Sequence, residues 1–317
     1  MKNRLIPFIF LSLFLLHCTK DTEKSVSSSF KLFSPVNPGV SGIDFQNVIQ
    51  EGLNTNVLMY EYFYNGGGVA VGDVNNDGLD DVYFTSNMQS NKLYLNKGNL
   101  AFQDITSSAG VSGREGPWKT GTTMVDINGD GWLDIYVCYS GNLSPEKRAN
   151  QLFVNQGVSP SGEVTFLDMA AAYGLNSFGT STQASFFDVD KDGDLDMFLL
   201  NHNPQSLPVL DEASTADILK TEDPNNGARL FRQDLLPNNQ PFFKDITMQA
   251  GIQSAALSYG VGAAIADYNG DGWLDIYVCY SGNLSPEKRA NQLFVNQGVS
   301  PSGEVTFLDM AAAYGLN

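Results

Sequence analysis

The sequence predicts an all-β fold, a β-propeller built of four-stranded blades, on three observations. An acidic nonapeptide recurs four times along the 317 residues. Runs rich in small, β-branched and aromatic residues flank each nonapeptide, and 31 glycines leave few stretches with helical apolar spacing. Hydrophobic residues make up 42% of the chain and aromatic residues 11%, which is enough for a sizeable core and excludes wholesale disorder.

The four nonapeptides share the pattern D-x-[DN]-x-D-G-x-x-D. They are DVNNDGLDD at 73–81, DINGDGWLD at 126–134, DVDKDGDLD at 188–196 and DYNGDGWLD at 267–275. Oxygens at positions 1, 3, 5 and 9 and a backbone carbonyl at position 7 can surround a hard cation, while the glycine at position 6 makes the sharp turn. Position 12 is never glutamate, which excludes helix-flanked EF-hands. We therefore expect about four structural Ca²⁺ ions, one in each loop.

The expected ligands form four sets of five, in which the seventh residue contributes its carbonyl. They are Asp73, Asn75, Asp77, Leu79 and Asp81; Asp126, Asn128, Asp130, Trp132 and Asp134; Asp188, Asp190, Asp192, Asp194 and Asp196; and Asp267, Asn269, Asp271, Trp273 and Asp275. The alternative is that these N-G, D-G and N-D sequences only make hairpin turns. However, the loops hold 15 of the 35 acidic residues, and like charges packed so closely repel unless a cation neutralises them.

Each loop lies between two predicted strands, and two more predicted strands follow it. In the first unit the four segments are 66–73, 81–87, 91–98 and 102–111. A hairpin followed by two strands has the composition of one propeller blade. The four expected blades cover residues 66–111, 118–176, 177–252 and 259–317.

The chain resembles the FG-GAP/VCBS-repeat proteins with integrin-α-like β-propellers, in particular the ASPIC/UnbV-associated lipoproteins of Bacteroidota. The acidic loops carry this resemblance over residues 42–317, and Tyr259-Gly260 with Gly262-Ala263 is similar to the two halves of the repeat signature. The resemblance implies that each cation lies in a blade hairpin and is structural. Propellers of this family usually have seven blades, so four blades imply an incomplete propeller with an uncovered sheet face at its end.

The first 17 residues predict a signal peptide. Lys2 and Arg4 precede a 12-residue apolar run at 5–16, which is too short to span a bilayer. The run ends just before Cys18, as in a bacterial lipoprotein signal, so Cys18 is the expected lipidation site and 18–41 the lipidated tether. We expect an extracytoplasmic outer-membrane lipoprotein, periplasmic or surface-exposed, that touches the membrane only through its lipid. The alternatives are an ordinary secretory signal and an uncleaved anchor.

An internal duplication marks the second half of the chain. Residues 128–176 recur letter for letter at 269–317, which makes 49 identical residues at an offset of 141. Because the other repeats have diverged, we expect this copy to be recent, or to come from a recombined or misassembled gene whose natural continuation is lost. Cys138 and Cys279 occupy equivalent positions in the two copies, and we expect both to be unpaired, buried core residues.

Composition and motifs point to binding rather than catalysis. A net charge of -17 argues against a nucleic-acid or polybasic membrane-binding face. His202 is the only histidine beyond the signal peptide, and no G-x-S-x-G motif accompanies it. We therefore expect no enzyme but a calcium-stabilised binding or adhesion module for a protein or glycan ligand. A polysaccharide lyase or hydrolase, and an inactive fragment of a longer propeller protein, stay open as alternatives.

Overall fold

The computed structural model describes residues 32–317, except for 117, 205–210, 212, 215–216, 219–220, 222, 253–258 and 282–289. The predicted signal peptide, Cys18 and most of the tether lie outside the described residues. The chain divides into two compact units, Met1–Val36 and Asn37–Asn317, and the second contains every element named below. None of the helices in the described part of the chain is long and apolar enough to cross a membrane.

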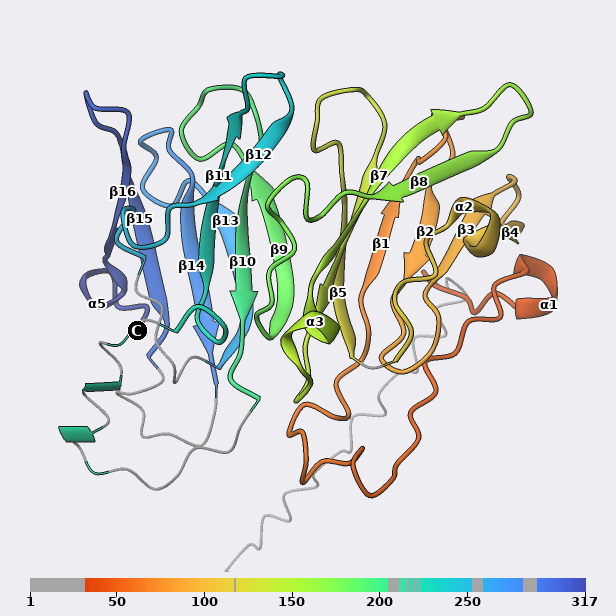
Figure 1. The fold of residues 1–317 in the computed structure, drawn as a ribbon, viewed down its shortest axis with the longest axis horizontal. Helices are drawn as coiled ribbons and strands as arrows, with labels where there is room; N and C mark the ends of the chain where they lie inside the picture. The colour runs from red at the N-terminus through yellow and green to blue at the C-terminus, as the bar shows by residue number, and fades with distance from the viewer. Residues whose placement is uncertain are drawn as a thin grey trace, which may run out of the picture. The chain divides into compact units, whose positions relative to one another are not determined.

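Four antiparallel sheets of four strands each follow one another along the second unit (Figure 1). The first contains β1 (Val69–Gly72), β2 (Asp81–Phe84), β3 (Lys92–Asn96) and β4 (Phe102–Asp104). The second contains β5 (Lys119–Val125), β6 (Asp134–Tyr139), β7 (Gln151–Val158) and β8 (Val164–Asp168). The third contains β9 (Ser181–Phe187), β10 (Asp196–Asn201), β11 (Arg229–Leu235) and β12 (Pro241–Asp245). The fourth contains β13 (Gly260–Ala266), β14 (Asp275–Tyr280), β15 (Gln292–Val299) and β16 (Val305–Asp309). Strands that are consecutive in sequence pair in every sheet, which confirms the predicted all-β class and the four-stranded blades.

Short helices occur between and after the strands. They are α1 (Pro38–Ser41), α2 (Thr106–Ala109), α3 (Pro145–Arg148) and α5 (Ala311–Tyr314). The prediction of one extended segment over 102–111 is wrong beyond Asp104, because α2 follows β4 directly. Gly110 ends this helix with φ 77°, and its N–H donates to the carbonyl of Thr106. The glycine that looked like the end of a strand is therefore a helix C-cap.

The first strands of consecutive sheets lie side by side, β1 with β5, β5 with β9 and β9 with β13. Gly121 on β5 permits this approach, because a Cβ there would lie 2.3 Å from the carbonyl oxygen of Thr182. Thr120 Oγ1 also donates to the carbonyl of Ser181 at 2.7 Å. This is how blades meet around a propeller axis. Among the described strands, the first sheet shares no extensive contact with the fourth, so the four sheets do not close a ring.

An apolar core fills the space between each sheet and the next. Between the second and third sheets it includes Tyr136, Leu152 and Leu175 on one side and Met197 and Phe231 on the other. Similar cores join the first sheet to the second and the third to the fourth. Burial of these faces is the main contribution to the stability of the fold.

The duplicated segment shows what a neighbouring sheet contributes. Tyr173 and Leu175, beneath the third sheet, are 6% and 0% exposed. The identical Tyr314, at the end of α5, and Leu316, just after it, are 49% and 38% exposed. In the described part of the chain, no fifth sheet covers them. The fourth sheet thus exposes a face that the same sequence buries in its first copy.

The two cysteines follow the same rule. Both are unpaired, as expected, but Cys138 is buried whereas Cys279 is only partly buried. The prediction that both are buried core residues is therefore wrong for Cys279. Ile276 and Val278 on the same strand pack against the third sheet, but no described sheet covers the opposite face, where Cys279 lies.

The uncovered face of the first sheet is partly shielded by the chain that precedes it. Phe45 stacks on Phe84 with ring centroids 4.8 Å apart, and the Tyr94 hydroxyl donates to Asp44 Oδ1 at 2.9 Å. The segment before β1 therefore packs where a preceding blade would lie.

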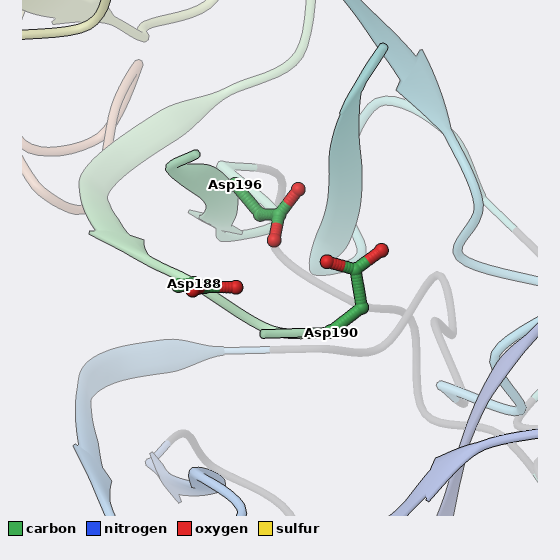
Figure 2. Close-up of side chains that lie close together, drawn as sticks. All are labelled: Asp188, Asp190 and Asp196. Carbon is green, nitrogen blue, oxygen red and sulfur yellow. The ribbon is translucent and has the colours of Figure 1, made fainter. Parts of the chain in front are cut away.

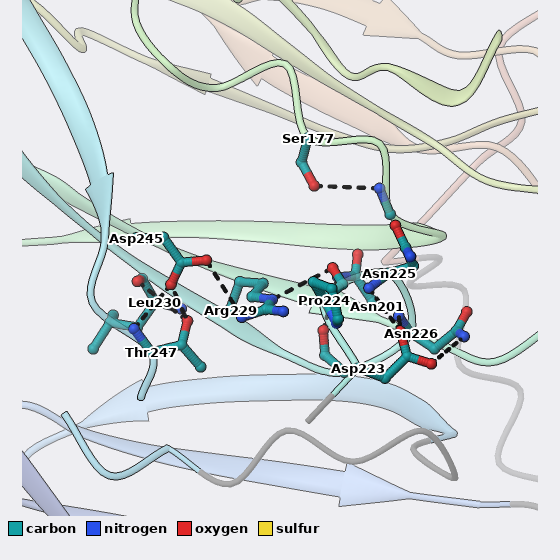
Figure 3. A network of polar contacts seen from close by, with 12 residues as sticks. Ser177, Asn201, Asp223, Pro224, Asn225, Asn226, Arg229, Leu230, Asp245 and Thr247 are labelled. Atoms are coloured by element: carbon teal, nitrogen blue, oxygen red, sulfur yellow. Dashed lines mark hydrogen bonds and ion pairs between the residues drawn. The ribbon is translucent and has the colours of Figure 1, made fainter. Parts of the chain in front are cut away.

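A polar network holds the chain where it enters β11 (Figure 3). Asp223 accepts hydrogen bonds from the backbone N–H of Asn225 at 2.9 Å and from Asn226 Nδ2 at 2.7 Å. Arg229, buried at the start of β11, pairs with Asp245 on β12 at 3.4 Å. These contacts position the third sheet after the long connection from β10.

Candidate functional site

All four acidic nonapeptides lie where the sequence predicted them, between the first and second strands of each sheet. The ninth residue of each loop is also the first residue of the second strand. These residues are Asp81, Asp134, Asp196 and Asp275, and all four are 0% exposed.

The ninth aspartate joins three parts of its blade. Asp134 Oδ2 accepts from the N–H of Ile127 within the loop at 3.1 Å, and Oδ1 accepts from the N–H of Asn155 on β7 at 2.8 Å. The same two main-chain bonds recur at the ninth residue of the other loops. The spacing of the nonapeptide alone does not predict this role. Its signal was an aspartate opening each second strand, at a position where an apolar residue would otherwise be buried.

Burial changes the acidity of three of these carboxyl groups. It raises the pKa of Asp81 to about 6, of Asp134 to about 7 and of Asp196 to about 8. The main-chain N–H donors oppose this rise, while neighbouring loop carboxylates add to it. A cation beside these groups would favour their charged form and lower the pKa again.

In the first, second and fourth loops, N–H groups of the loop itself donate hydrogen bonds to several of its carboxylates. In the second loop, Asn128 Nδ2 donates to Asp130 Oδ2 at 2.9 Å, and Trp132 N–H donates to Asp130 Oδ1 at 2.9 Å. The N–H of Gly131 donates to Asp126 Oδ2 at 2.8 Å. Corresponding bonds occur in the first and fourth loops, which also have asparagine at position 3. Such local bonds stabilise the turn itself, as the hairpin alternative requires, and each carboxylate oxygen keeps a second lone pair.

The third loop is different because position 3 is an aspartate, which offers no amide donor. Oxygens of Asp188, Asp190 and Asp196 lie within 4.8 Å of one another. Figure 2 shows these three side chains close together. One oxygen each of Asp188, Asp190 and Asp194 is buried with no hydrogen-bond partner. Desolvation raises the pKa of Asp190, and that of Asp194 to about 6. No other loop in the described part of the chain brings three carboxylates this close.

This arrangement fits a hard divalent cation. Buried oxygens without donors are costly, and an ion held by carboxylates and carbonyls would satisfy them. The structure brings together Asp188, Asp190 and Asp196, three of the five residues expected to ligate an ion in this loop. Asp192 remains exposed, and its Oδ1 accepts from the N–H of Asp194 at 3.1 Å. The side chain of Asp194, expected to contribute only its carbonyl, is one of those with an unpartnered oxygen.

Two of the loops are also tied to the following blade. Asn155 Nδ2, on the second sheet, donates to the carbonyl of Val74 in the first loop at 2.9 Å. Asn296 Nδ2, on the fourth sheet, donates to the carbonyl of Val189 in the third loop at 3.0 Å. An interaction that holds one of these loops in place therefore also stabilises the contact between neighbouring sheets.

Comparisons with known proteins agree with this repeat structure. Residues 62–137 match the FG-GAP-like repeat family, which confirms the expected repeat in that part of the chain. Cartilage acidic protein 1 of Xenopus tropicalis is 28% identical over 224 residues, which are 70% of this chain and 30% of that protein. The Homo sapiens protein of the same name is 26% identical over 237 residues, 74% of this chain and 31% of that protein. The chain thus matches about a third of the length of these curated relatives.

Among solved structures, the chain is similar to that of an Agrocybe aegerita lectin, described as showing specific recognition of non-reducing terminal N-acetylglucosamine. The TM-score is 0.36 at 16% identity, over 76% of this chain and 50% of that chain. A likeness of this size carries no argument about fold or ligand.

Proposed function

We propose that this chain is a calcium-stabilised, extracytoplasmic binding module with no catalytic activity, which presents a protein or glycan ligand site on blades of the FG-GAP/VCBS type. The third loop is the observation that carries the proposal: three converging carboxylates with buried, unpartnered oxygens. A Ca²⁺ ion there would be held by Asp188, Asp190 and Asp196. The first, second and fourth loops, with the same spacing, would hold the remaining ions of about four per chain.

The ions act mechanically in this proposal. Each would fix the loop between the first two strands of a blade, and the ninth aspartate extends that effect to the third strand. Since the unfolded chain has no such site, the free energy of binding adds to the free energy of folding. Neighbouring blades gain as well, because Asn155 and Asn296 anchor the loops of the preceding sheets.

Burial of the most perturbed carboxyl group supports a non-catalytic role. Asp196 has the raised pKa, about 8, expected of a general acid. However, it is 0% exposed, and both oxygens accept main-chain hydrogen bonds, so a polymer substrate cannot reach it. Catalysis by this group would require the blade to open.

Metal counting on matched variants tests the proposal. Equilibrium dialysis against Ca²⁺ should give about four ions per wild-type chain. Asp190→Ala, which removes the ligand oxygens at position 3, should lose one ion and lower the melting temperature in Ca²⁺. Asp80→Ala makes the same change at an exposed residue outside the ligand sets, and should change neither quantity. If Asp190→Ala keeps its metal content and stability but abolishes depolymerisation of a polysaccharide by the wild type, the loop is catalytic and the proposal is wrong.

Lipid anchoring at Cys18 is part of the same proposal and has its own test. In a bacterial host that processes lipoproteins, the mature wild type should begin at Cys18 and incorporate labelled palmitate. Cys18→Ala should incorporate none. Equal labelling of both would contradict the proposed anchor.

A further inference from the structure

A cavity of about 240 Å³ lies where the first strands of the sheets converge. Residues at or just before the starts of β1, β5, β9 and β13 line it, whereas the acidic loops follow the ends of those strands. The cavity is therefore at the opposite end of the blades from the candidate metal loops. Exposed Gly66, Gly67 and Val261 mark its opening, and Val261 is 54% exposed.

Four rings from distant parts of the sequence line this cavity. Tyr60 and Tyr62 come from the segment before β1, Trp118 precedes β5, and His202 follows β10. Tyr62 and His202 lie 4.0 Å apart between ring centroids, and Tyr60 meets Trp118 edge to face at 5.3 Å. Tyr60, Trp118 and His202 are buried, while Tyr62 is half-buried and leaves part of its surface open.

Two of the rings that line the cavity each have a buried nitrogen without a hydrogen-bond partner, Trp118 Nε1 and His202 Nδ1. Buried polar atoms are nearly always paired in folded proteins, so this pair needs an explanation. The indole N–H can only donate, so it requires an acceptor. A molecule with acceptor oxygens would supply one.

His202 requires the opposite kind of partner. The Tyr60 hydroxyl donates to Ser140 Oγ at 3.1 Å and lies 3.4 Å from His202 Nε2, so Nε2 can donate to the Tyr60 oxygen. Burial lowers the pKa of His202 to about 3, which keeps the ring neutral. A neutral imidazole that donates through Nε2 accepts through Nδ1. The bound molecule must therefore offer a donor as well as an acceptor.

The charge around the cavity excludes most ionic ligands. With His202 neutral, no lining residue carries a charge. An anion would also be repelled by the carboxylate of Glu61, which acts electrostatically on the lining Tyr62, and by the net charge of -17 on the chain. An ammonium ion has no acceptor for the Trp118 indole. A neutral molecule with hydroxyl groups meets all of these conditions.

We infer that this axial cavity is a binding site for one neutral sugar residue, with hydroxyl groups at Trp118 Nε1 and His202 Nδ1 and an apolar ring face on Tyr62. The volume corresponds to about eight water molecules, which is small for a ligand pocket and suits a single ring. Aromatic side chains provide both the apolar face and the polar atoms that such a ring needs. This inference rests on the binding role proposed above and assigns that role a site and a ligand class.

The indole N–H resonances provide a direct test, because the chain has only three tryptophans and one lies at the cavity. The whole chain is labelled with ¹⁵N-tryptophan and titrated with methyl glycosides of neutral hexoses, deoxyhexoses, pentoses and N-acetylhexosamines. Each is raised to about 50 mM, which would nearly saturate a site with a dissociation constant of about 1 mM. At least one should shift the Trp118 resonance and leave those of Trp132 and Trp273 in place.

Matched variants separate the cavity from the rest of the surface. Tyr62→Ala should weaken binding of that glycoside by about fivefold or more, whereas Tyr64→Ala, in the same segment but outside the cavity, should leave it unchanged. Val261→Trp, at the exposed opening, should block binding without disturbing a buried contact.

Three results would overturn the inference. They are no shift of Trp118 with any neutral glycoside, equal affinity in wild type and Val261→Trp, or binding of methyl glucosaminide or a methyl uronide in place of the neutral sugars. If Val261→Trp still binds a macromolecular ligand as the wild type does, the proposed binding role stands and only the cavity assignment is wrong. If neither the wild type nor the variant binds any protein or glycan, the proposed function is wrong as well.

Discussion

Replacing Leu175 and Leu316 by alanine, one at a time, compares the same side chain in the same 49-residue segment with and without a covering sheet. The local hydrogen bond is the same in both copies, since the hydroxyls of Tyr136 and Tyr277 donate to the carbonyls of Leu175 and Leu316 at 2.9 and 3.0 Å. Leu175 is 0% exposed in a closed core, where Leu→Ala costs about 2.7–5 kcal/mol of unfolding free energy. Leu316 is 38% exposed and leaves no closed cavity, so its loss should be about 1 kcal/mol.

Urea denaturation of the two variants should therefore differ by about 2 kcal/mol or more in unfolding free energy. A control pair shows whether the fourth sheet contributes to the measured transition. Phe153 and Phe294 are equivalent and 3% and 1% exposed, each in the core shared with the preceding sheet. Alanine at either should cost about 3–5 kcal/mol. Equal losses for Leu175→Ala and Leu316→Ala, with both controls destabilised, would refute the conclusion that sheet-on-sheet packing buries this face.

Two further predictions concern the inner strands and the loops. Gly121→Ala places a Cβ 2.3 Å from the Thr182 carbonyl oxygen and should lower the unfolding free energy measured in urea by about 1–3 kcal/mol. Gly262 is the equivalent position on β13 and has no atom within 4 Å of its Cβ position, so Gly262→Ala should change the unfolding free energy by less than about 1 kcal/mol. Equal losses for the two variants would contradict the close approach of β5 and β9. In EDTA, the raised pKa values of Asp134 and Asp196, about 7 and about 8, mean that their contribution to stability is full below the unfolded pKa near 4 and is lost as the pH rises through 7 and 8. The melting temperature in EDTA should thus fall between pH 5 and 8, and its increase on adding Ca²⁺ should grow over the same range; a calcium effect independent of pH would be the contrary result.

The acidic loops and the strands beside them could be predicted because their determinants are local. The D-x-[DN]-x-D-G-x-x-D spacing fixes a turn, and the alternating runs before and after it fix a hairpin. The sequence also showed that position 3 of the third loop is Asp190 rather than asparagine. The effect of this change, which is to leave carboxylate oxygens without donors, depends on side-chain positions that the sequence does not specify.

Contacts between distant residues could not be predicted in this way. The ninth aspartate bonds a strand that lies 15 to 37 residues further on, as Asp134 does with Asn155, and nothing in the loop motif specifies that partner. The axial cavity joins Tyr60 to His202, which are 142 residues apart. His202 directly follows β10, and its complete burial depends on Tyr60 and Tyr62, aromatic residues from a distant segment of the chain.

The most direct test of the central claim, that divalent ions in the acidic loops stabilise the blades, is the melting temperature of the purified chain in Ca²⁺ and in EDTA. With dissociation constants of about 1 mM, 10 mM Ca²⁺ adds about 1.4 kcal/mol per site. Four such sites should raise the melting temperature by about 10 °C or more at pH 7.5. The same melting temperature in Ca²⁺ and in EDTA would show that the loops hold no stabilising ion, and would contradict the claim.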